Sequence, residues 1–170
     1  MNGLDVLFSR RSIRRYKEGI IENETMERLV HAGMVAPSAF NQQPWEFIII
    51  KDKKRLNQIA LHHPYASMVK YAAGFILVCA EPNKDERNLG MWCQDCSAAT
   101  ENILLAAHAL GLGAVWIGVY PSDEYMTIFR NICDIPSDIL PFSGVCVGLP
   151  SKTKPPANRF DKQMIHWNKW

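Results

Sequence analysis

The sequence has almost no excess charge of either sign and no long apolar run. Lysine and arginine together number 19 and aspartate and glutamate 17, which leaves a net charge of +2 over 170 residues. A general nucleic-acid binder usually shows a broader basic excess, so that class is disfavoured. The longest apolar run, Ala72–Ala80, is far too short to span a bilayer. The opening residues place charge after a short apolar stretch, unlike a signal peptide. We therefore expect a cytoplasmic protein with no membrane partner.

Cysteine is also scarce, and its number is odd. An odd count does not favour a disulfide framework, and reduced core thiols are the expected state in an intracellular chain. Cys93 and Cys96 have the C-x-x-C spacing of a redox pair or of half a zinc site, but they fall inside a predicted helix. No second Cys or His pair has the spacing of a tetrahedral site, because His62 and His63 are adjacent. We expect packing thiols and no metal. The five cysteines are Cys79, Cys93, Cys96, Cys133 and Cys146.

The length fits one domain, residues 1–170. Apolar periodicity predicts helices over 2–8, 24–35, 53–63, 91–113 and 123–132, with Asn2, Asn23 and Ser122 as N-caps. Apolar β-branched runs predict strands over 46–51, 74–80, 114–120 and 143–150. Alternation alone favours an α/β protein. After Pro150 the chain becomes polar and rich in proline, so residues 151–170 are expected to form a C-terminal arm. Trp167 and Trp170 suggest that this arm packs on another subunit.

The stretch "SRRSIRRY" (Ser9–Tyr16) contains four arginines within six residues. Because the whole chain is nearly neutral, this cluster is a local feature. The planar fork of arginine matches phosphate oxygens, and the serines add hydroxyl donors. On the residues alone, an anion site, a solvated helix end and a nucleic-acid contact all remain open, the last being the weakest.

A second unusual stretch is "APSAFNQQPWEF" (Ala36–Phe47), in which two prolines bracket Ser38, Asn41, Gln42 and Gln43. Its backbone amides and carboxamides could bond the edge of a polar ring, although a plain loop with an asparagine turn has the same composition. A third stretch, "GLGAVWIG", faintly resembles a dinucleotide-binding loop. It precedes a predicted strand instead of following one, so the Rossmann geometry is wrong.

Together the first two stretches resemble the flavin-binding signature of the nitroreductase family, which are FMN-dependent NAD(P)H oxidoreductases. "AAHALGLGAVWIGVYP" and the ending "GLP…PPANRFD" are similar to the short subgroup of that family. The resemblance covers essentially the whole chain and implies an α+β fold instead of α/β. That fold has a mixed, mostly antiparallel sheet surrounded by helices, in an intertwined homodimer with two FMN molecules at the subunit interface.

The resemblance also implies roles for the basic residues. Arg10 should bind the FMN phosphate, and Arg159 should be its second ligand. Arg11 and Ser12 should bind the phosphate or the ribityl hydroxyls. Arg14 should lie near N1 and O2 of the isoalloxazine ring, where a fixed cation stabilises the negative charge left by two-electron reduction. Arg15 is left as a solvated residue.

Two further groups of residues follow from the same resemblance. Gly118 and Val119 should offer backbone N–H groups to N5 and O4, and a glycine lets the backbone approach the ring closely. At Tyr65 and Met68 some members of the family have a basic residue or an asparagine, so these two should line the substrate pocket. The partner chain should line the flavin with Pro37, Ser38, Ala39, Asn41 and Gln43.

The activity implied by the resemblance is ping-pong hydride transfer from NAD(P)H through flavin N5 to nitroaromatics, quinones or similar small acceptors. The cofactor carries the chemistry, so no catalytic side chain is expected. Two alternatives stay open: a specialised reductase for enoate, halogenated or flavin substrates, and a flavin-binding module that senses or stores FMN without turnover. No motif marks the physiological acceptor or a preference between NADH and NADPH.

Overall fold

Helices and strands alternate along the chain in the computed structural model, which describes residues 2–84, 87 and 89–170. The helices are α1 (Gly3–Ser9), α2 (Asn23–Met34), α3 (Lys53–His62), α4 (Trp92–Ala109) and α5 (Asp123–Cys133). The strands are β1 (Tyr16–Lys17), β2 (Trp45–Ile50), β3 (Gly74–Ala80), β4 (Gly113–Gly118) and β5 (Leu140–Pro150). Short 3-10 helices are η1 (Ala39–Asn41), η2 (Ser67–Tyr71), η3 (Pro82–Lys84) and η4 (Lys162–Met164).

The strands form one open sheet in which every named pair is antiparallel. The last strand, β5, lies between β3 and β4, because the same stretch of β5 pairs with both. β2 pairs with β3, and the short β1 pairs with the end of β5. The expected α+β class is confirmed. The α/β class that alternation favoured is wrong, because the final strand returns antiparallel between two earlier ones instead of extending a parallel sheet.

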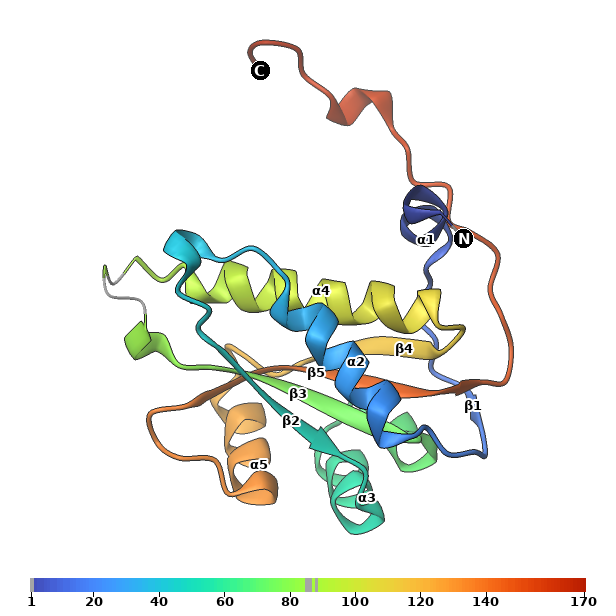
Figure 1. The fold of residues 1–170 in the computed structure, drawn as a ribbon, viewed down its shortest axis with the longest axis vertical. Coiled ribbons are helices and arrows are strands. Elements are labelled where there is room, and N and C mark those ends of the chain that lie inside the picture. The colour runs from blue at the N-terminus through green and yellow to red at the C-terminus, as the bar shows by residue number, and fades with distance from the viewer. Residues whose placement is uncertain (1, 85–86, 88) are drawn as a thin grey trace.

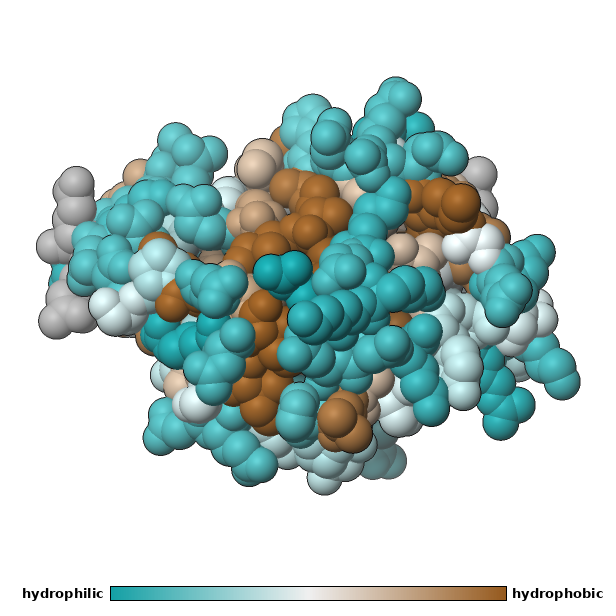
Figure 2. All heavy atoms as spheres, turned by 90° about the horizontal axis from the view of Figure 1, so that it is seen from below, coloured by the Kyte–Doolittle hydropathy of each residue, from teal (hydrophilic) through white to brown (hydrophobic). Residues whose placement is uncertain are grey.

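Helices cover both faces of the sheet, as Figure 1 shows, with α2 and α4 on one side and α3 and α5 on the other. The strand β3 is buried along its whole length. Its residues alternate between two cores: Ile76 and Val78 pack with the α2–α4 side, and Phe75 and Leu77 with the α3–α5 side. Seen from below, a limited band of apolar side chains is exposed within a mostly hydrophilic surface (Figure 2).

Two glycines of β5 make room for aromatic rings that fix the sheet. A Cβ on Gly144 would lie 2.0 Å from Phe75, and one on Gly148 would lie 2.6 Å from Tyr16. The Tyr16 hydroxyl donates to the Ile13 carbonyl oxygen at 2.8 Å. Burial raises the pKa of this phenol, so it remains a neutral donor. The ring therefore anchors the end of the arginine-rich segment to the sheet.

Both ends of the chain lie away from the core. The helix α1 buries none of its residues, and residues 151–170 run away from the sheet beyond it (Figure 1). Large apolar side chains stay exposed on these ends: Phe8 at 70%, Trp167 at 82% and Trp170 at 98%. Exposed apolar surface of this kind marks an interaction site. Within the described residues, no helix has the length and apolar character needed to cross a membrane.

Candidate functional site

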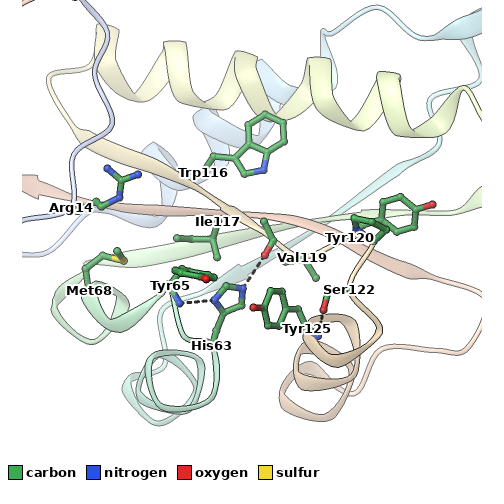
Figure 3. A pocket seen from close by; sticks show the side chains of 12 residues that line it. Arg14, His63, Tyr65, Met68, Trp116, Ile117, Val119, Tyr120, Ser122 and Tyr125 are labelled. Atoms are coloured by element: carbon green, nitrogen blue, oxygen red, sulfur yellow. Dashed lines mark hydrogen bonds between the residues drawn. The ribbon is translucent and has the colours of Figure 1, made fainter.

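A hollow of about 560 Å³ opens beside the carboxyl end of β4 (Figure 3). Five of the predicted site residues meet here: Arg14, Tyr65, Met68, Gly118 and Val119. They come from three separate segments of the chain, around residues 14, 65–68 and 118–119, so the fold brings together residues that lie far apart in the sequence. The rest of the lining is His63, Trp116, Ile117, Tyr120, Pro121, Ser122 and Tyr125.

Arg14 is held at one end of the hollow by the backbone on either side of it. The Ile13 N–H donates to the Ala114 carbonyl oxygen at 2.9 Å, and the Ser151 N–H donates to the Arg15 carbonyl oxygen at 3.0 Å. In the described part of the chain, the Arg14 guanidinium has no ion pair and no hydrogen bond. The segment thus presents a fixed backbone and an unpaired cation to the hollow.

His63 forms the inner wall and was missed by the sequence analysis. It is buried, with 1% of its surface exposed, and its ring lies 4.3 Å from that of Tyr125. The Tyr65 N–H donates to Nδ1 at 3.3 Å, so the hydrogen belongs on Nε2, which donates to the Gly118 carbonyl oxygen at 2.8 Å. The imidazole therefore holds the Gly118 carbonyl oxygen by a hydrogen bond from outside the sheet. Its position follows Leu56 and Ile59 on the buried stripe of α3, and that helical spacing could have revealed it.

The turn that follows β4 carries an unsatisfied donor. Val119 is 1% exposed, and its N–H has no acceptor among the described residues, whereas the next N–H, of Tyr120, donates to Phe142 at 2.9 Å. Buried N–H groups are nearly always paired, so this one indicates a missing acceptor. At Gly118 an added Cβ would meet nothing within 4 Å. The backbone here can be approached closely by a ligand.

The second predicted segment, Pro37–Gln43, does not line this hollow. It lies beside the beginning of α4 (Figure 1), where the buried Asp95 accepts from the Ala39 N–H at 3.0 Å. The Gln43 N–H donates to the Ser38 hydroxyl at 3.0 Å. Three residues, Phe40, Asn41 and Gln43, have φ between 50° and 57°. Left-handed backbone of this kind costs free energy and concentrates at binding sites.

The arginines do not converge on one point within the chain. Nε of Arg10 pairs with Oε1 of Glu101 at 3.1 Å, and Arg11 donates to the Pro155 carbonyl oxygen. The Ser12 carbonyl oxygen accepts from Lys154 at 3.3 Å. Arg159 is exposed on the arm. Their predicted contacts to a phosphate therefore stay predictions.

The five cysteines are packing residues and not reactive thiols. Burial raises the pKa of Cys79 and of Cys146 to about 12, and it raises the pKa of Cys93 and Cys96 as well. All are free thiols and stay protonated near neutral pH, so they are poor nucleophiles. Within the described ranges, no group of three His, Cys, Asp or Glu side chains could hold a metal.

The fold and this hollow define an α+β protein whose candidate ligand site combines an unpaired cation with a buried backbone N–H that has no acceptor within the described residues. The model of the nitroreductase family matches residues 7–72 and 58–149. A relative from Archaeoglobus fulgidus, assigned provisionally as an NADH dehydrogenase/NAD(P)H nitroreductase, is 44% identical over 170 residues, which cover 98% of each chain. The chain therefore belongs to the nitroreductase family, as its motifs predicted.

Solved structures agree with this assignment. A protein from Parabacteroides distasonis, with the same provisional name as the Archaeoglobus relative, superposes with a TM-score of 0.94 at 41% identity over 98% of both chains. A provisional nitroreductase from Desulfovibrio desulfuricans was solved in complex with FMN. It is 30% identical, with a TM-score of 0.83, over 100% of this chain and 99% of its own.

Proposed function

We propose that this protein is an FMN-dependent NAD(P)H oxidoreductase that works by ping-pong turnover. NAD(P)H and a small acceptor, such as a nitroaromatic or a quinone, would use the same site in turn. The observation that carries the proposal is the hollow itself, where the unpaired Arg14 cation and the orphaned Val119 N–H line one cavity. No carboxylate lines that cavity in the part of the chain that the structure describes. The FMN complex of the Desulfovibrio relative and the names of the other relatives support it.

The residues present fit FMN. When bound, FMN supplies a two-electron carrier that takes hydride at N5 and delivers it to an acceptor. Arg14 would place its cation beside N1 and O2 of the ring, where negative charge is stabilised on reduction. Gly118 and Val119 would direct backbone N–H groups to N5 and O4. His63 would keep that backbone in place through its bond to the Gly118 carbonyl oxygen, and Tyr65 and Met68 would border the acceptor.

The site would be completed by a second copy of the chain in a homodimer. Pro37–Gln43 of one copy would lie over the ring held by the other, and Arg10, Arg11, Ser12 and Arg159 would hold the phosphate and ribityl chain. The exposed apolar side chains on α1 and on the arm, residues 151–170, support this arrangement, because a folded monomer gains nothing by leaving them in water. The cytoplasmic location remains a prediction from the sequence.

The direct test is a visible absorption spectrum of the purified protein, recorded without oxygen before and after adding NADH and then NADPH. We expect a flavin spectrum that bleaches with one of these donors and returns when a quinone is added. A flavin spectrum that neither donor bleaches would replace the oxidoreductase with a non-turnover flavin module. A protein that binds no FMN when FMN is supplied would refute the assignment of the hollow.

A further inference from the structure

A second hollow, of about 520 Å³, adjoins the first one. Both are lined by Arg14 and Met68, so the two share a wall and a ligand too long for one can extend into the other. The second hollow is lined by Arg14, Arg15, Tyr16, Ser67, Met68, Lys70, Tyr71 and Ser151. None of the residues assigned to the flavin lies in it apart from Arg14.

This second hollow is positively charged without compensation. Three cations line it, Arg14, Arg15 and Lys70, and no carboxylate does so among the described residues. None of the three side chains forms an ion pair within residues 2–84, 87 and 89–170. Elsewhere in the described residues, ion pairs are formed by Arg10, Arg55 and Lys84, the last with Glu46 at 3.0 Å. Like charges held side by side repel, so their gathering indicates an anionic ligand.

The fixed parts of the hollow match phosphate chemistry. Ser151 donates from both its N–H and its hydroxyl to the Arg15 carbonyl oxygen, at 3.0 and 3.2 Å, which holds the Arg15 backbone at the rim. A guanidinium fork and a lysine point charge are the side chains that bind phosphate best. The Lys70 Nζ stays within 4.9 Å of the Tyr71 ring, and that ring is 63% exposed, which leaves a flat surface for a base or a ribose.

We propose that this second hollow binds the phosphate groups of the NAD(P)H donor while the nicotinamide occupies the first hollow. The inference rests on the proposed function and adds the recognition of the donor to it. Arg15 and Lys70 become the residues that bind the donor, and neither is needed for FMN. Because NADPH has one phosphate more than NADH, the site favours NADPH. Because the cations are exposed, this preference weakens as salt is added.

The test compares three donors of the same hydride: NADPH, NADH and dihydronicotinamide riboside, which has no phosphate. The variant is Arg15→Gln with Lys70→Met, and the control is Lys54→Met, an exposed lysine on α3 outside both hollows. Both contacts are exposed and screened by solvent and salt, so their loss together should lower kcat/KM for NADPH about 10- to 100-fold in the double variant. The value for the riboside, the FMN content and the reoxidation rate with a neutral quinone should not change, and the control should match the unmodified protein.

A second measurement keeps the inference separate from the proposed function. Calorimetry should detect binding of 2′,5′-ADP, a fragment with phosphates but no nicotinamide, to the unmodified protein and not to the double variant. If no donor bleaches the flavin but 2′,5′-ADP still binds, the proposed function fails and the phosphate site stands. Equal losses with NADPH and the riboside, or no binding of 2′,5′-ADP, would overturn the phosphate site. A changed rate only for acidic acceptors such as nitrobenzoate would overturn it too, because the cations would then serve the acceptor.

Discussion

Two regions of this chain have the marks of one ligand site, yet they differ in how they are built. The hollow beside β4 rests on the sheet, and its polar groups face an open cavity with Arg14 unpaired and Val119 unsatisfied. The loop Pro37–Gln43 has its own hydrogen bonds, including the one from Ala39 to Asp95, but it lies outside this hollow. Its Phe40 ring packs against the Arg87 guanidinium, whose Cζ lies 3.8 Å from the ring centroid. One region is therefore an open cavity, and the other is a loop shaped on the surface.

The comparison teaches that the proposed homodimer would have to join these two regions, the hollow of one copy and the loop of the other. Left-handed residues at Phe40, Asn41 and Gln43 fix the shape of the loop at a cost, as is common at binding sites. In that arrangement the exposed apolar residues on α1 and on the arm would be where the second copy attaches. The predictions below separate or weaken the two halves, and they run from the largest expected effect to the smallest.

Removing residues 160–170 should separate the halves completely. Every residue of that segment is exposed, so its loss should leave the melting temperature of the monomer nearly unchanged. The dimer should dissociate, and FMN affinity should fall by more than about 100-fold, because half of each site leaves with the partner. Sedimentation and FMN titration at equal protein concentration measure both effects. Lys162→Ala, in the same segment, is the control, and a shortened dimer that still binds FMN tightly would exclude the arm.

Arg14→Ala should damage the hollow while leaving the loop intact. Losing a charge-assisted contact of about 1.5–3 kcal/mol should weaken FMN binding about 10- to 100-fold. It should also lower the flavin midpoint potential, because the cation that favours the reduced ring is gone. Titration of the apoprotein and a redox titration of the holoprotein report the two effects. Arg15→Ala, one residue further on, should change neither, and an unchanged potential in Arg14→Ala would remove Arg14 from the ring.

His63 tests whether the backbone donors need to be held in place. His63→Leu leaves the Gly118 carbonyl oxygen without its donor, which costs about 1–3 kcal/mol. Because the free protein bears part of that cost, FMN affinity should fall about 5- to 20-fold. In His63→Gln the side-chain amide can donate to the same oxygen, so most of the affinity should return. The FMN affinity and the position of the flavin absorption band distinguish this role from simple packing. If His63→Leu and His63→Gln lower FMN affinity equally, the hydrogen bond to Gly118 does not contribute to FMN binding.

Asp95 tests the loop from within the same chain. Asp95→Leu removes the acceptor of the Ala39 N–H and should weaken FMN binding by about 3- to 10-fold through a loosened loop. Asp95→Asn keeps an oxygen acceptor and should stay near the unmodified protein, which separates the hydrogen bond from the charge. FMN titration with a parallel thermal melt is sufficient. If Asp95→Asn weakens FMN binding as much as Asp95→Leu does, the effect belongs to the carboxylate charge and not to the hydrogen bond.

The sequence predicted most of the elements but not their pairing. The Asn2 cap is confirmed by a capping box, and the Ser122 cap by its bond from the Tyr125 N–H. The Asn23 cap is wrong, because the helix begins at Asn23 itself and the side-chain oxygen accepts from Lys51 at 2.7 Å. The two-residue β1 was missed because only its pairing with the distant β5 defines it. Local patterns cannot show such long-range neighbours.

Site residues that belong to a sequence motif were predictable, whereas those brought together only by tertiary packing were harder to predict. Family motifs indicated Arg14, Gly118 and Val119, and the structure gathers all three at one hollow. The sequence analysis considered His63 only with His62, as an adjacent pair unsuited to a metal. The helical spacing of His63 after Leu56 and Ile59 could nevertheless have predicted that it is buried. The hollow around Arg15 and Lys70 was not predictable, because it depends on Ser151 folding back against the arginine-rich segment.

Mixing two damaged chains tests the central claim, that each FMN site is shared between two copies. Arg14→Ala damages the hollow, and Asn41→Gly removes the loop amide while keeping its left-handed backbone possible. Mixed dimers, isolated with two different affinity tags, would combine both chains. The account predicts that each mixed dimer regains one site with the FMN affinity of the unmodified protein, although neither parent dimer has any. If the mixed dimers bind FMN no better than their parents, the site lies within one chain and the account is wrong.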